Sequence, residues 1–135
     1  MKPHEEAKRR LVREWLKKAD DDIGLAEHLL SERSVFANAI AFHSQQAAEK
    51  YLKAFLVWRE VEFPKTHDLD ELLDLVQTVN EHLAASLRDV IVLTPYGAEF
   101  RYPADRLDAT PDQPRQAVVL ARKARDAVMA ALPRV

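Results

Sequence analysis

Apolar residues recur at steps of three and four along most of the chain, a spacing that places them on one face of an α-helix. The first such stretch runs from about Glu5 to Leu30 and predicts a long helix. Gly24, inside this helix, is expected to allow close packing of a neighbour. The expected buried face comprises Leu11, Val12, Trp15, Leu16, Ala19, Ile23, Ala26, Leu29 and Leu30.

A second helix is predicted from about Val35 to Arg59, with Ser34 as its N-cap. Its stripe of residues is almost unbroken and mostly apolar, which favours a position at the centre of the molecule. The stripe consists of Phe36, Ile40, His43, Ala47, Tyr51, Ala54 and Trp58. Its aromatic members, with Phe55, are expected in the core or in a dimer interface.

The second half of the chain predicts shorter helices. After a loop over Val61–His67, Asp68 followed by Glu71 forms an aspartate version of the capping box. A further helical piece is expected over Glu81–Leu93, and an irregular segment over Thr94–Ala109. The last helix is expected to run from Thr110, Pro111 and Gln113, which form a helix-start signal, to about Leu132. The sequence thus predicts an all-α fold, an up-and-down antiparallel bundle of four to five helices in a single domain over residues 1–135.

Composition supports a helical protein and narrows its chemistry. Only two glycines occur in 135 residues, too few for the many turns of an all-β fold, and the absence of cysteine excludes disulfides and thiolate metal sites. The histidines lack zinc-site spacing, and the consecutive carboxylates of Asp20–Asp22 point in different directions on a helix. No glycine-rich phosphate loop exists, which excludes a P-loop NTPase. We therefore expect neither a metal ion nor a cofactor.

Charge and hydropathy favour a cytoplasmic protein. The segment Met1–Arg13 is charged and lacks the apolar core of a secretion signal, and no apolar run is long enough for a membrane span. We therefore expect no membrane partner. The formal net charge of −2 is unlike that of a strongly basic nucleic-acid-binding protein, although it is compatible with a local basic patch.

A first group of candidate functional residues lies on the second predicted helix. Gln46 and Lys50 follow His43 at i+3 and i+7, so the three side chains share one edge of the helix. They are interpreted either as a polar cluster that binds a phosphate or a base, or as a buried histidine with a lysine that reaches outward. Lys53 and Lys65 extend the group to an electropositive groove, or else lie on a solvated face.

A second group lies nearer the C-terminus. His67, just before the capping residue, is either a general acid or base at a helix N-terminus or a residue that fixes the entry into that helix. Arg101 grips a phosphate with its guanidinium, or pairs with a carboxylate across the bundle. Tyr102 stacks on a base, or fills the core.

Three segments together resemble a known family. They are Trp15–Ala19 with the acidic run behind it, Phe42–Ala54 (FHSQQAAEKYLKA), and Pro64–Leu69 (PKTHDL), followed in order by Phe100–Pro103 (FRYP). The chain resembles the HEPN family (higher eukaryotes and prokaryotes nucleotide-binding), in its small prokaryotic stand-alone form. The resemblance covers most of the chain, and the second segment is its most specific part.

The resemblance implies a helical bundle that pairs as a homodimer through its first two helices and acts on nucleotides or RNA. Family members often accompany a small nucleotidyltransferase in toxin–antitoxin systems, and others are metal-independent ribonucleases. The ribonucleases carry an arginine followed four to six residues later by a histidine. No arginine here precedes a histidine at that gap: Arg33 lies ten positions before His43, and Arg59 eight before His67.

Three functions follow as hypotheses. The first is a homodimeric nucleotide-binding module that works with a nucleotidyltransferase partner. The second is a metal-independent ribonuclease with a diverged site, in which His43 or His67 is the acid–base group and Arg101 the phosphate-binding cation. The third is a dimeric scaffold without a small ligand. In the first, His43, Gln46, Lys50, His67 and Arg101 line the site.

Overall fold

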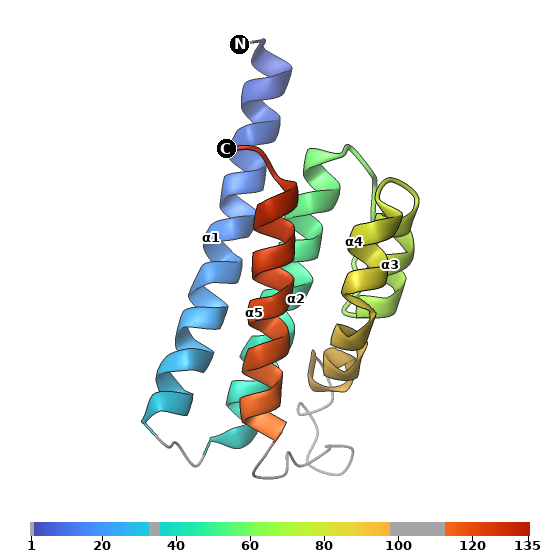
Figure 1. Ribbon diagram of the computed structural model, residues 1–135. Coiled ribbons are helices and arrows are strands. Elements are labelled where there is room, and N and C mark those ends of the chain that lie inside the picture. Colours follow the sequence, from blue (N-terminus) through green and yellow to red (C-terminus); the bar gives the residue numbers. More distant parts are fainter. Residues whose placement is uncertain (1, 33–35, 98–112) are drawn as a thin grey trace.

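Every regular element in the described part of the chain is helical. The computed structural model describes residues 2–32, 36–97 and 113–135 (Figure 1). These ranges contain α1 (Pro3–Ser31), α2 (Ala37–Trp58), α3 (Leu69–Gln77), α4 (Glu81–Ser86), the 3₁₀-helix η1 (Arg88–Gly97) and α5 (Gln113–Ala131). The predicted all-α bundle is confirmed.

The long elements alternate in direction. In Figure 1, α1 descends, α2 ascends beside it, α4 and η1 descend together, and α5 ascends in parallel with α2. The short helix α3 breaks this alternation, because residues 59–68 return along the bundle before α3 begins and α3 therefore ascends like α2. The chain thus runs along one edge of α2 immediately before α3, which brings Phe63 and His67 close to that edge.

Helix α2 is the centre of the fold. It packs against α1, α3, η1 and α5, and 13 of its 22 residues are buried. Ile40, Ala47, Tyr51 and Ala54 of the predicted stripe are in the core. Phe36 precedes the helix and is 62% exposed, so it is not in the core, and the alternative of a dimer interface stays a prediction.

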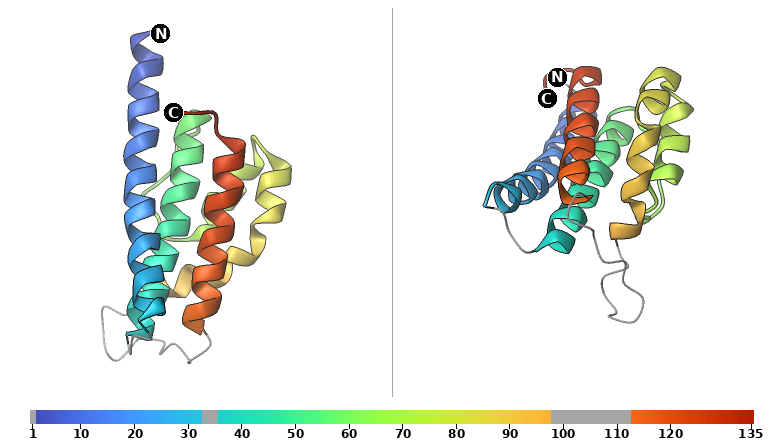
Figure 2. Two further views of the ribbon diagram at one scale, coloured as in Figure 1. Left: turned by 60° about the vertical axis from the view of Figure 1, so that its left-hand side comes forward. Right: turned by 60° about the horizontal axis from the view of Figure 1, so that its bottom comes forward.

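Helix α1 lies along α2 and extends past it at the N-terminal end (Figure 2). Its buried residues, at the predicted spacing, are Val12, Leu16, Ala19, Ile23 and Ala26. Leu11, which was expected on this face, is instead exposed. The expectation for Gly24 is also wrong: a Cβ atom added at this exposed position would meet no atom within 4 Å, so no neighbour packs closely there.

Several predicted boundaries shift. Helix α2 begins at Ala37 with Phe36 at the N-cap and without a side-chain cap bond, while Ser34 lies outside the described residues. The helical piece expected over Glu81–Leu93 divides into α4 and η1. The irregular segment was expected from Thr94, but η1 continues to Gly97; the remainder of that segment and the start signal at Thr110 lie outside the described residues.

The start of α3 follows the predicted cap with one difference. The Asp68 carboxylate accepts a hydrogen bond from the backbone N–H of Asp70, as an N-cap residue should. Glu71 does not reach back to the backbone N–H of Asp68. It accepts instead from the Thr66 hydroxyl, and that hydroxyl oxygen accepts from the N–H of Asp68. The Thr66 hydroxyl thus bridges the two groups that would bond directly in the expected capping box.

No helix within the described ranges has the length and apolar character needed to cross a membrane.

Candidate functional site

The candidate residues of α2 lie on its polar edge, between α1 on one side and the segment before α3 on the other. Gln46, Lys50 and Lys53 follow His43 at helical spacing, and Gln45 and Glu49 continue the edge toward α3. Because α2 is enclosed by its neighbours, these side chains are buried or half-buried. Their polar atoms therefore need partners inside the protein.

Asp22 of α1 pairs with two candidates from α2. Its Oδ1 lies 2.9 Å from His43 Nδ1, and its Oδ2 accepts a hydrogen bond of 2.5 Å from Lys50 Nζ. All three side chains are largely shielded from solvent. Since Coulomb attraction is stronger in a partly buried pair than at the surface, this cluster fixes how α1 lies on α2.

Glu49 forms a second cluster of the same composition on the α3 side. Its Oε1 lies 2.7 Å from His67 Nδ1, and its Oε2 accepts a hydrogen bond of 3.0 Å from Lys53 Nζ. The Glu49 side chain is only 4% exposed, whereas that of His67 is 48% exposed. The buried carboxylate therefore holds a histidine at the surface, and the histidine lies in the segment that leads into α3.

Gln45 and Gln46 join the two clusters. Gln46 Nε2 donates to Gln45 Oε1, and Gln45 Nε2 donates to the His67 backbone carbonyl at 3.0 Å and toward Glu49 Oε1 at 3.2 Å. Gln45 is fully buried beneath Gly97, where an added Cβ would come within 2.8 Å of the Gln45 amide. A glycine at this position therefore gives the buried amide its space.

The two histidines share one chemical arrangement. Each has Nδ1 against a carboxylate that also pairs with a lysine, so Nδ1–H donates to the carboxylate, and in the neutral form of the ring Nε2 offers a lone pair. Neither Nε2 atom has a hydrogen-bond partner among the residues that the structure describes. Carboxylate, imidazole and a free Nε2 together form an arrangement that can accept a proton or a hydrogen bond from a ligand.

Aromatic rings border the polar edge. Trp15 of α1 and Phe63 of the segment before α3 meet edge to face, with centroids 6.2 Å apart. Lys53 Nζ lies 5.5 Å from the Trp15 ring centroid and 5.7 Å from that of Phe63. These contacts, together with Glu49, hold the Lys53 ammonium in place.

The three consecutive aspartates of α1 have three different partners, as their directions on a helix predict. Asp21 pairs with Lys17 on the surface, and Asp22 joins the first cluster. Asp20 accepts a hydrogen bond of 2.6 Å from the Tyr51 hydroxyl, on the other side of the contact between α1 and α2. Burial, then the bond to Asp20, raises the pKa of Tyr51 far above its ordinary value, which keeps this phenol neutral.

The structure thus brings most of the sequence-predicted candidates into one region. His43 and Lys50 share Asp22, His67 and Lys53 share Glu49, and Gln46 joins the two sets. Lys65 is exposed in the segment before α3 and has no ion pair with a described residue. Arg101 and Tyr102 lie outside the described residues.

The sequence prediction missed the groups that organise the region, namely Asp22, Glu49 and Gln45. The spacing of Gln45, Glu49 and Lys53 at successive steps of four is a local signal that identifies the second cluster. Asp22 belongs to another helix, so its choice of His43 and Lys50 depends on how α1 and α2 pack and has no local signal.

We predict that Glu49→Ala lowers the free energy of unfolding by about 3 kcal/mol, because it leaves the buried Lys53 ammonium without its counter-ion. Glu49→Gln keeps an acceptor oxygen at the same place and costs less. Urea unfolding followed by circular dichroism measures both, with Glu14→Ala, at an exposed position of α1, as the control. A Glu49→Ala protein as stable as the Glu14→Ala control would contradict the structural role of the cluster.

One comparison with known proteins gives a result. A sequence model described as the HEPN domain matches residues 12–131, a range that contains both clusters and all candidate residues. No curated protein and no solved structure matches the chain. The matched range covers nearly the whole sequence, and the chain therefore belongs to the HEPN domain family.

Proposed function

We propose that this protein is a homodimeric HEPN module that binds a nucleotide on the polar edge of α2 and works with a nucleotidyltransferase partner in a two-component system. One observation carries the binding site: the polar edge offers Nε2 of His43, Nε2 of His67 and Oε1 of Gln46 without partners among the described residues, and the aromatic rings of Trp15 and Phe63 lie farther along the same edge, around Lys53. Hydrogen-bonding groups next to aromatic rings are typical of a site for a nucleobase.

The charges of the site favour recognition of a base over cleavage of a phosphodiester. Lys50 and Lys53 are each neutralised by a buried carboxylate, so neither is an uncompensated cation for a phosphate group. A phosphate that approached them would also meet Asp22 and Glu49. The absence of an arginine–histidine pair at the ribonuclease spacing agrees with this preference.

The homodimer is supported by a row of residues on α1 next to the site. The row advances at alternating steps of four and three, the spacing of a helix–helix seam, and consists of Leu11, Trp15, Lys18, Asp22, Leu25 and Leu29. Leu11 and Leu25 are 43% and 42% exposed. A second copy packed along this row would cover them and would border the nucleotide site. The nucleotidyltransferase partner is proposed from the family resemblance alone.

We predict that a nucleotide raises the thermal midpoint of the dimeric protein, since a ligand that binds only the folded state stabilises it by about 2.7 kcal/mol at a hundredfold excess over Kd. The four ribonucleoside triphosphates and their monophosphates are compared by differential scanning fluorimetry and titration calorimetry. Gln46→Ala and His67→Ala should lose the effect, whereas Gln116→Ala, an exposed glutamine of α5, should keep it. A folded dimer that no nucleotide stabilises would exclude the proposed site.

A metal-independent ribonuclease is the second candidate. The observation that favours it is the carboxylate behind each histidine, which orients the imidazole and makes Nε2 a better base for the 2′-hydroxyl of RNA.

For this candidate we predict RNA cleavage in EDTA by the purified protein, reduced at least about a hundredfold in the variant that lacks the base, His43→Ala or His67→Ala. Arg101→Ala tests the phosphate-binding cation in the same assay, and Gln116→Ala is again the control. Cleavage that survives all three substitutions equally would indicate a contaminating nuclease.

A further inference from the structure

The N-terminal end of α1 carries a charge opposite to that of the rest of the molecule. Residues 1–13 contain five basic and two acidic side chains, whereas residues 14–135 contain 15 basic and 20 acidic ones. A net charge of −2 for the whole chain therefore conceals a basic end of about +3. This end extends beyond α2 and α5 in Figure 1 and in the left view of Figure 2, and most of its described residues are exposed.

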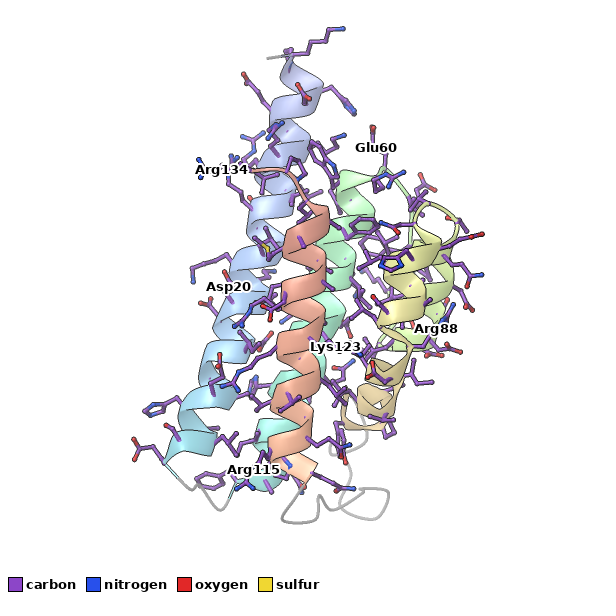
Figure 3. All side chains as sticks on the ribbon, viewed as in Figure 1. Asp20, Glu60, Arg88, Arg115, Lys123 and Arg134 are labelled. Carbon is purple, nitrogen blue, oxygen red and sulfur yellow. The ribbon has the colours of Figure 1, made fainter. Side chains whose placement is uncertain are left out.

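A cavity of about 520 Å³ lies on this basic end, between α1 and the C-terminal segment. Arg9, Arg10 and Arg13 line it together with Pro3, Glu6 and Val135. Arg13 follows Arg9 at i+4 and Arg10 at i+3, so the three guanidinium groups belong to one side of the helix. Figure 3 shows the neighbouring Arg134 where the C-terminal segment passes α1.

The bonding of these arginines leaves most of their donors free. Nη1 of Arg9 donates to the Arg134 backbone carbonyl, and Nη1 of Arg13 donates to the Val135 carbonyl at 2.7 Å. Nε of Arg9 is buried and has no hydrogen-bond partner in the described part of the chain. Arg10 forms neither a hydrogen bond nor an ion pair with any described residue. Each guanidinium carries five N–H donors, so many remain for a ligand.

The arginines of the basic end differ from the lysines of the candidate site in that no acidic side chain in the described part of the chain neutralises them. On α2, each lysine of the two clusters has its own buried carboxylate. On the basic end, no aspartate or glutamate side chain of the described residues pairs with Arg9, Arg10 or Arg13, although Glu6 lines the same cavity and a main-chain oxygen of Val135 accepts from Arg13. Arg9 has a structural reason for its position, since its guanidinium lies 5.1 Å from the Trp58 ring centroid. Arg10 has no such contact.

We propose that this arginine-lined cavity binds phosphate groups of a nucleic-acid strand. Planar guanidinium groups bind phosphate oxygens in pairs, and uncompensated cations in a cleft concentrate anions. A second cavity, of about 650 Å³ and lined by Lys2, His4, Glu5 and Lys8, lies on the same end of α1. Basic groups along about three helical turns fit several consecutive phosphates of a strand better than one small anion.

This site is separate from the proposed nucleotide site. Asp22 and Trp15 project toward the polar edge of α2, whereas Arg9 and Arg13 contact the C-terminal segment on the other side of α1. The proposal holds whether or not the polar edge binds a nucleotide. Because the two sites have different residues, binding of a strand at α1 can be tested separately from binding of a base at α2.

The test is fluorescence polarisation of a labelled single-stranded RNA of about 12 nucleotides with the full chain, between about 50 and 200 mM NaCl. We expect Arg10→Glu to weaken binding at least tenfold, and the slope of log K against log salt to fall by about 0.7 for each lost phosphate contact. Arg115→Glu is the matched control: it makes the same change in charge at an exposed residue, shown at the opposite end of the bundle in Figure 3, and should leave binding unchanged.

Equal losses in Arg10→Glu and Arg115→Glu would overturn the proposal, because binding would then depend on net charge alone. Wild-type protein that does not bind the RNA would also overturn it. Inorganic pyrophosphate, tested by calorimetry, distinguishes the strand from a small anion: binding of pyrophosphate without binding of RNA would contradict the strand. Circular dichroism of both variants checks that they remain folded.

Discussion

The fold has to accommodate one carboxylate that is the most deeply buried charged side chain among the described residues. Glu49 lies in the middle of α2, a helix enclosed by α1, α3, η1 and α5, and its side chain has almost no contact with solvent. A charge in that position is tolerated only when it is paired and hydrogen-bonded. Lys53, His67 and Gln45 meet this requirement. The segment before α3 therefore passes close to α2, and α3 begins immediately after it.

The same requirement, met a second time by Asp22, gives the molecule two matching clusters of a histidine, a carboxylate and a lysine. In each, the lysine neutralises the charge of the carboxylate, and Nε2 of the histidine stays available for a hydrogen bond to a ligand. The structural and the proposed functional roles thus fall on different atoms of one network. A ligand that bonded to the free nitrogens would not disturb the ion pairs, which hold α1 and the segment before α3 on α2.

Much of the fold could be predicted from the sequence because helical periodicity is a local property. The spacing of Val12, Leu16 and Ala19 identified the buried face of α1, and the edge shared by His43, Gln46 and Lys50 identified the polar side of α2. Asp22 could not be identified in this way, because its partners depend on how two helices pack. Phe36 lies outside the core because it precedes the first residue of α2, although the helical spacing of the apolar residues includes it.

The central claim is that a carboxylate holds Nδ1 of both His43 and His67 and leaves Nε2 free. Long-range ¹H–¹⁵N correlation spectra of the imidazole rings, recorded near about pH 9 where neutral rings predominate, measure this directly. The account predicts that both rings carry the proton on Nδ1, and that Asp22→Ala releases His43 alone while Glu49→Ala releases His67 alone. Spectra in which both wild-type rings carry the proton on Nε2 would contradict it.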